Sequence, residues 1–281
     1  KWTWSNTASY AKKIGVHDFD VLVGVEMYKE ETIDFSAYKD DYLIETPEQM
    51  WPDMGIGTSK VTGTASGYTL LSYFGKVNYA YDNRYLASAT LRYDGSSRFG
   101  KNNRFGTFPA FSVGYRISEE AFMEDTKNWL SDLKLRFAWG QTGNQETSNT
   151  AVHTIYVTDY GTGDPTWTSL NGTSYDLTGK GGTTLPSGYK KTQQGNPDLK
   201  WETTTQTNIG LDFGFFNQRL YGTAEYYIKK TKDILVQPPY LGIIGEGGYC
   251  WYNGASMENK GFEISLGYRD QTAFGLSYGI T

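Results

Sequence analysis

The amino-acid sequence alternates apolar and polar residues in segment after segment, along most of its length. The alternation is clearest at 20–27, 111–118, 133–140, 262–269 and 274–281. Successive side chains of a β-strand point to opposite faces, so each segment would have one apolar and one polar face as a strand. Repeated many times, this pattern predicts an all-β, antiparallel transmembrane barrel with apolar side chains toward lipid and polar side chains toward the lumen.

About ten strands are predicted, and most are near the roughly 9–11 residues with which a tilted strand crosses a bilayer. They are expected at 2–12, 18–30, 68–81, 85–94, 107–118, 132–142, 201–216, 219–232, 260–270 and 273–281. Every second connection is long and polar: 31–67, 95–106 (of medium length), 143–200 and 233–259. Loops sorted by length in this way are typical of a barrel with short periplasmic turns and long extracellular loops. A soluble β-sandwich gives no reason for such sorting.

The fifth connection, 119–131, is longer than the other connections on the short side. It places acidic residues next to Phe122, Met123 and Trp129, and it follows Ser118, a suitable N-cap residue. The sequence therefore predicts a small amphipathic helix at this turn.

Composition and charge exclude several classes of protein. No run approaches the ~18 consecutive apolar residues of a membrane helix, and the mean hydropathy of −0.55 fits an alternating barrel wall. The net charge is −5 and no basic block occurs, so the electrostatic footprint of a nucleic-acid-binding protein is missing. Cys250 is the only cysteine, which excludes a disulfide within the chain.

The sequence offers no pattern for catalysis or for a metal site. His17 and His153 are the only histidines, and with Cys250 they form neither a triad nor a zinc-binding spacing. The acidic pairs at 30–31 and 40–41 are better explained as solvated loop faces than as Ca²⁺ ligands. We therefore predict no catalytic residues, no metal ligands and no cofactor.

Aromatic residues in the long polar connections are the better candidates for ligand binding. Their rings could stack on sugars or on peptide side chains, and loops on a rigid scaffold commonly carry function. The alternative is that the rings pack the loops against one another. The candidates are Trp51, Tyr160, Trp167, Tyr240, Trp251 and Tyr252.

Charged residues on the polar face of the predicted strands form a second candidate set. In a barrel this face lines the lumen, where exposed ion pairs contribute only about 0–1 kcal/mol each because water screens them. The residues are Lys76, Arg92, Arg116, Lys134, Arg136, Glu225 and Glu263.

Several segments resemble the barrel of the SusC-like (RagA-type) TonB-dependent transporters of the Bacteroidetes outer membrane. The resemblance is densest in Leu91-Arg92-Tyr93-Asp94-Gly95-Ser96-Ser97-Arg98-Phe99-Gly100 and in Asn103-Arg104-Phe105-Gly106-Thr107-Phe108-Pro109-Ala110. The segments with the resemblance are 91–100, 103–110, 114–120, 133–136, 139–145, 195–202, 226–235 and 253–263, in the order of that family.

This resemblance implies a multi-pass outer-membrane barrel of 22 strands, filled by an N-terminal plug. It implies import of oligosaccharides or peptides, energised through TonB, ExbB and ExbD, with a SusD-like surface lipoprotein as a lid. The lumen-facing charges would then meet the plug. We expect residues 1–281 to be a partial barrel domain without the plug and the final strands. A passive porin-like channel and a secreted carbohydrate-binding β-sandwich remain as alternatives.

Overall fold

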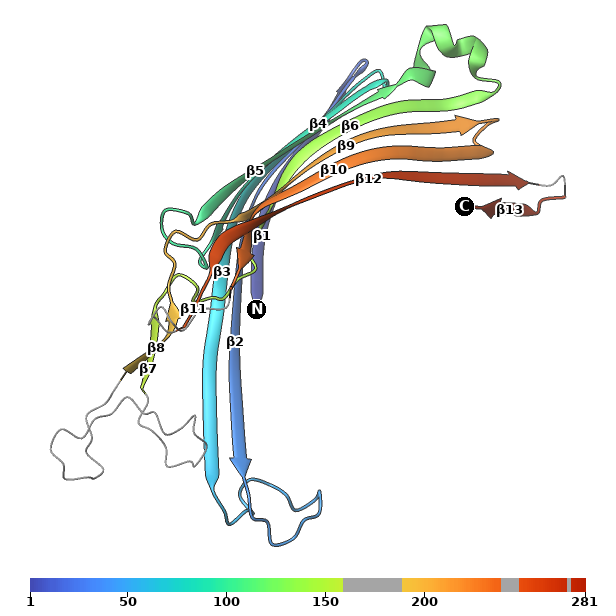
Figure 1. The fold of residues 1–281 in the computed structure, drawn as a ribbon. Helices are drawn as coiled ribbons and strands as arrows, with labels where there is room; N and C mark the ends of the chain where they lie inside the picture. The colour runs from blue at the N-terminus through green and yellow to red at the C-terminus, as the bar shows by residue number, and fades with distance from the viewer. Residues whose placement is uncertain (159–188, 239–247, 272–273) are drawn as a thin grey trace.

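The computed structural model describes residues 1–158, 189–238, 248–271 and 274–281. Within these ranges, no helix has the length and apolar character needed to cross a membrane. The short turns gather at one end of the molecule and the long connections at the other (Figure 1).

A single curved antiparallel sheet of ten strands dominates the fold (Figure 1). Its order is β1-β2-β3-β4-β5-β6-β9-β10-β12-β13, so each strand pairs with its neighbours along the chain apart from the interposed β7, β8 and β11. The strands are β1 (Trp2–Ile14), β2 (His17–Lys39), β3 (Ser59–Tyr81), β4 (Tyr85–Ser96), β5 (Phe105–Arg116), β6 (Leu130–Asn144), β9 (Glu202–Phe215), β10 (Leu220–Val236), β12 (Tyr252–Gln271) and β13 (Ser277–Ile280). In the described residues β1 and β13 form the two edges, and the sheet is not closed.

A second, three-stranded sheet lies at the long-connection end. It contains β7 (Ile155–Thr158), β8 (Tyr189–Gln194) and β11 (Tyr249–Cys250), in the order β11-β8-β7. β7 and β8 are antiparallel, whereas β11 runs parallel to β8. The sequence had predicted polar loops here.

The register confirms the predicted division of the large sheet into two faces. One row of paired residues crosses eight strands, and all but Ala87 are large apolar or aromatic residues: Phe19, Tyr79, Ala87, Val113, Phe137, Ile209, Tyr226 and Phe262. The adjacent row has small or charged residues at most positions: Asp18, Ala80, Leu86, Gly114, Arg136, Gly210, Glu225 and Glu263. The apolar face is open, with Phe262 64% exposed. Such an exposed apolar surface fits contact with lipid.

Aromatic rings border this apolar face at both ends. At the short turns, Tyr81, Tyr85 and Tyr115 are successive register partners, with ring centroids 6.1 and 5.1 Å apart. Toward the long connections, Tyr93 stacks on Phe105 at 4.8 Å. The eight residue-to-residue steps from Tyr85 to Tyr93 span about 27 Å along the strand, comparable to the roughly 25 Å apolar band of a membrane barrel. These rings match the two aromatic girdles of such a barrel.

Two of the predicted loops are shorter than expected, because their flanking strands continue beyond the girdles. β2 and β3 pair without interruption from His17 and Tyr81 out to Lys39 and Ser59, so the predicted loop at 31–67 shrinks to 40–58. Similarly, β12 starts at Tyr252 instead of residue 260. The bilayer limits where the apolar face ends, but it does not limit the hydrogen-bonded ladder.

The helix predicted at 119–131 is wrong in type. Two 3₁₀ helices, η1 (Ile117–Glu119) and η2 (Ala121–Thr126), replace it. Ser118 is not an N-cap: it lies inside η1, and its hydroxyl donates to Asp132 at 3.3 Å. Glu120 separates the two helices in an extended conformation (ψ 146°), which interrupts the helical hydrogen bonds.

Candidate functional site

The polar face of the large sheet carries all seven predicted charged residues. Arg116 and Lys134 are register partners, and Arg136 shares a row with Glu225 and Glu263. Lys76 and Arg92 lie at even positions of β3 and β4, on the same face. Their placement on one face follows from strand alternation, whereas their predicted contact with a plug stays a prediction.

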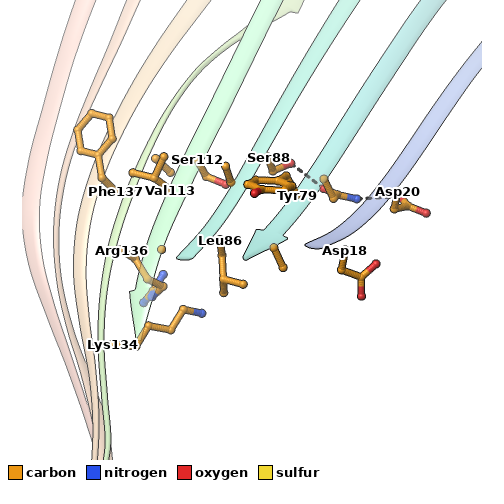
Figure 2. Close-up of a pocket in the computed structure, with 15 residues that line it drawn as sticks. Asp18, Asp20, Tyr79, Leu86, Ser88, Ser112, Val113, Lys134, Arg136 and Phe137 are labelled. Carbon is orange, nitrogen blue, oxygen red and sulfur yellow. Dashed lines mark hydrogen bonds between the residues drawn. The ribbon is translucent and has the colours of Figure 1, made fainter. Parts of the chain in front are cut away.

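A hollow of about 610 Å³ lies in this polar wall (Figure 2). Its floor is made largely of small side chains: Ala80, Ser88, Ser112, Gly114 and Ala138. Acidic side chains stand on one flank, from β2, and basic side chains on the other, from β6 (Figure 2). These flanking residues are Asp18, Asp20, Lys134 and Arg136. The hollow therefore presents opposite charges at its two sides.

The acidic flank is held by a hydrogen-bond chain across three strands. Ser88 Oγ donates to Asn78 Oδ1 at 2.9 Å, and Asn78 Nδ2 donates to Asp20 Oδ1 at 2.9 Å (Figure 2). This chain fixes the Asp20 carboxylate against the wall. The carboxylate keeps unused acceptor positions, because a carboxylate can accept about four hydrogen bonds.

The basic flank is only partly neutralised. Arg136 Nε lies 2.9 Å from Asp212, and one of its terminal nitrogens lies 3.3 Å from Glu225. In contrast, Lys134 and Arg116 have no carboxylate within 4 Å among the described residues, although their strands place them side by side. On its other side Lys134 is the register partner of Asp212, but the carboxylate of Asp212 is bound by Arg136. Two adjacent cations with no ion pair of their own favour an acidic partner from outside the described wall.

A buried apolar cluster, which we call the loop platform, lies at the long-connection end. It consists of Phe99, Phe108, Ala151, Leu199 and Trp201. Trp251, Leu70, Val152 and Leu235 pack against it. Segments more than 50 residues apart in the sequence meet here, so the platform ties several long connections to the barrel wall.

Hydrogen bonds join the same segments around the platform. Trp201 Nε1 donates to the carbonyl of Arg104 at 3.0 Å. Asn103 Nδ2 donates to the carbonyl of Asp198 at 2.8 Å. Similarly, the Asn253 side-chain amide accepts from the Lys200 N–H at 3.0 Å and donates to its carbonyl at 2.8 Å. Most of these residues belong to the segments that carry the family resemblance, so in this chain those motifs hold the loops together.

Three of the six predicted loop aromatics, Trp51, Trp251 and Tyr252, lie among the described residues. Trp51 is 61% exposed in the 40–58 connection, where its indole N–H donates to the Glu48 carbonyl. Trp251 is part-buried against the loop platform, and Tyr252 begins β12 as an exposed residue. Tyr160, Trp167 and Tyr240 lie outside the described residues.

Sequence reasoning missed two exposed aromatic residues and the loop platform itself. Tyr156 in β7 and Tyr249 in β11 are both exposed on the small sheet. No alternation marks these short strands, and only the motif around Arg98 and Phe99 signalled the platform. Among the described residues, no three His, Cys, Asp or Glu side chains gather closely enough to hold a metal ion.

An open antiparallel sheet with a lipid-type outer face, a polar inner face and loops sorted by length is the wall of an outer-membrane β-barrel. Comparison with known proteins makes the assignment specific. The model of the family "TonB dependent receptor-like, beta-barrel" matches residues 2–281, and the chain belongs to this family. It is therefore an outer-membrane chain that crosses with strands.

The relatives agree with the predicted SusC-like resemblance. The TonB-dependent receptor SusC of Bacteroides thetaiotaomicron is 36% identical over 97% of this chain and 26% of its own length. A TonB-dependent receptor of Formosa agariphila is 32% identical over 94% of this chain and 25% of its own length. The chain thus spans about a quarter of the curated relatives it matches.

Solved structures give the same result. The structure of the RagAB peptide transporter superimposes with a TM-score of 0.80 at 30% identity, over 97% of this chain and 28% of that chain. The ferric enterobactin receptor of Pseudomonas aeruginosa has a TM-score of 0.56 at 14% identity, which shows the fold alone. A single curved sheet and these relatives do not support the alternative of a secreted β-sandwich.

Proposed function

We propose that this chain is part of the barrel wall of an energy-coupled importer that takes up glycans or peptides across the outer membrane. The observation that carries the proposal is the combination of a two-faced wall with partly unpaired charges on its inner face. A passive pore needs only the two faces. Lys134, which has no ion pair and lies on the flank opposite Asp18 and Asp20, and its neighbour Arg116 favour a wall that receives a second folded part.

In this proposal the inner hollow seats the plug of the complete protein. Lys134 and Arg116 would pair with acidic residues of the plug, and Asp18 and Asp20 with basic ones. Arg136 is already neutralised by Asp212 and Glu225, so its main role is to stiffen the wall. Part-exposed pairs of this kind are individually weak, at about 0–1 kcal/mol each, which suits a plug that must move during transport.

The partners follow from the same architecture. We propose that TonB, with ExbB and ExbD, moves the plug from the periplasmic side, and that a SusD-like lipoprotein covers the long connections. Trp51 and Tyr252 are exposed enough to contact a ligand or this lid, whereas Trp251 packs the loop platform. The RagAB structure, which this chain resembles, is that of a peptide transporter, and this likeness supports a peptide as one candidate cargo.

Uptake by cells that carry the complete protein tests the proposal. Accumulation of labelled maltodextrins and of a tryptic digest of casein would be measured with and without a protonophore. We expect uptake of at least one of the two to fall to background when the proton-motive force collapses, and equally in cells without TonB. Uptake that survives both treatments would identify a passive porin-like channel instead.

A further inference from the structure

The side chain of Arg98 is buried in a connection between two strands, which is an unusual place for a buried charge. Only 9% of this side chain is exposed. Charged side chains are rarely so deeply buried unless their donors are used. The mechanism proposed above gives Arg98 no role.

The guanidinium of Arg98 joins three separate parts of the chain. Its Nε donates to Asn149 Oδ1 at 2.7 Å, and one terminal nitrogen donates to the Gln145 carbonyl at 3.3 Å. Its plane covers the ring of Tyr68 in β3, with 4.0 Å between Cζ and the ring centroid. Asn149 in turn donates to Ser66 Oγ at 2.7 Å. The group therefore fastens the connection after β6 onto β3.

The two residues after Arg98 fasten a different connection. Phe99 is almost fully buried in the loop platform, and its ring centroid lies 5.2 Å from that of Trp201. A Cβ added at Gly100 would overlap the carbonyl oxygen of Pro197. Arg98 and Phe99 thus hold the 145–154 and 195–201 segments from one short stretch of backbone.

We infer that Arg98 is a positioning residue that locks the loop platform to the barrel wall, so that the 145–154 and 195–201 segments of the long connections move with the wall as one unit. The inference rests on the proposed function in one respect: these connections would present the ligand-binding surface. Arg98 itself is not a ligand contact, because its guanidinium is buried and already bonded.

The positioning role of Arg98 depends on the flat shape of its guanidinium more than on the charge. Among the described residues, the carboxylate near Arg98 is that of Glu146, which is 3.4 Å away and 80% exposed, so water and salt screen this pair. The Tyr68 ring, the Asn149 amide and the Gln145 carbonyl need a flat group with several donors. A lysine ammonium cannot stack and bond in this way. Arg98→Lys should therefore fail to replace Arg98, and high salt should leave the lock intact.

Cys250 provides a reporter within this chain. Cys250 is 2% exposed, and the adjacent Trp251 packs on the loop platform. The test uses the complete protein in outer membranes, with any cysteine outside this chain replaced by alanine, and measures the rate of maleimide labelling. We expect slow labelling of the parent, at least tenfold faster labelling of Arg98→Gln and Arg98→Lys, and an intermediate rate for Asn149→Ala.

The matched control is Arg104→Gln, which removes an exposed guanidinium with no side-chain partner among the described residues. Its labelling rate should equal that of the parent, and labelling of the parent should not change in 1 M NaCl. Thermal midpoints of all variants are measured in parallel, because a globally unfolded barrel would label quickly without any local effect. Labelling of Arg98→Gln at the parent rate, or rescue by Arg98→Lys, would overturn the inference.

A second readout separates positioning from general stability. The concentration dependence of uptake is measured with the tryptic digest of casein. Arg98→Gln should raise the half-saturating concentration at least fivefold while the maximal rate stays within twofold. A lower maximal rate at unchanged half-saturation would contradict a positioning role. If the parent does not take up the digest, peptide import fails as the proposed function, and the labelling result still decides the role of Arg98.

Discussion

Arg136 is bound by two carboxylates on the inner wall. It lies between Asp212 and Glu225, and Glu225 faces Glu263 across the next pair of strands, with no second cation paired to either glutamate among the described residues. Arg136 therefore separates carboxylates that would otherwise repel one another. Its side chain is about one-third exposed, so water weakens each of these interactions.

Arg136→Gln should destabilise the complete protein by about 1 kcal/mol, because two part-exposed ion pairs are lost and the repulsion of the carboxylates remains. Urea unfolding of the detergent-solubilised protein measures the change. A second substitution, Asp212→Asn, should lower the free energy of unfolding less in the Arg136→Gln protein than in the parent protein. Equal costs in both backgrounds would show that the two side chains do not interact.

Glu120 links the turn between β5 and β6 to the aromatic girdle. The Tyr85 hydroxyl donates to its carboxylate at 2.7 Å, and Tyr115 and Arg84 donate to it at 3.2 and 3.1 Å. The hydrogen bond from Tyr85, followed by those from Tyr115 and Arg84, lowers the pKa of Glu120. The charged form is thus the one that the fold stabilises.

A lowered pKa in the folded state fixes the pH dependence of this contact. The stability that charged Glu120 adds to the folded protein is fully present above the pKa of about 4.3 that glutamate has in the unfolded chain. This stability is lost as the pH falls through the lower pKa of Glu120 in the folded protein. The thermal midpoint of the parent should exceed that of Glu120→Gln at pH 7, and the difference should shrink toward pH 3. A difference that is equal at both pH values would show that Glu120 acts without its charge.

At the scale of the strand, the two faces of the barrel wall make opposite predictions. Ala89 of β4 lies exposed on the apolar face, midway between the girdle residues Tyr85 and Tyr93, and Ala138 of β6 lines the inner hollow, which has room for a longer side chain. Ala89→Arg should cost roughly 2–4 kcal/mol, because the charge would lie in lipid near the bilayer midplane. Ala138→Arg is the matched control and should cost much less. Folding titrations in lipid vesicles measure both, and equal costs would contradict the assignment of the faces.

The strands that the sequence predicts well are those with strict alternation. β4 was expected at 85–94 and is found at Tyr85–Ser96, because lipid on one side and water on the other impose a period of two. β8 (Tyr189–Gln194) was missed, because its six residues include two lysines and two glutamines and show no apolar face. Such a strand forms because it pairs with neighbouring strands, and the sequence of the strand itself does not show which strands will be its neighbours.

The same distinction holds for the candidate site. Strand parity alone predicts that the charges of the inner wall share one face, since each residue's face follows from its position in the strand, and their role in facing a plug stays a prediction. The loop platform was not predicted, because its contacts join residues as distant as Arg104 and Trp201. Trp251 looked like a loop aromatic in sequence and is in fact part of this packing.

At the scale of the whole molecule, the two edges of the sheet decide what the described chain can do alone. β1 and β13 leave one side of their backbone unpaired in the described residues. Each unpaired N–H or C=O group costs several kcal/mol in the hydrocarbon core, where no water can replace its partner. Over two edges the cost is on the order of tens of kcal/mol, far above the ~5–15 kcal/mol by which a domain is stable.

Residues 1–281, produced alone, should therefore neither insert as a barrel nor form a pore. Refolding into lipid vesicles, followed by planar-bilayer recording, measures this, with the complete protein as the control for insertion. We expect the isolated chain to aggregate or to stay on the vesicle surface, accessible to protease, and to give no discrete conductance. A reproducible single-channel conductance would show that the chain closes on itself or pairs its edges with a second copy. The inner wall would then be a lumen without any plug, and the roles proposed for Lys134 and Arg116 would have to be abandoned.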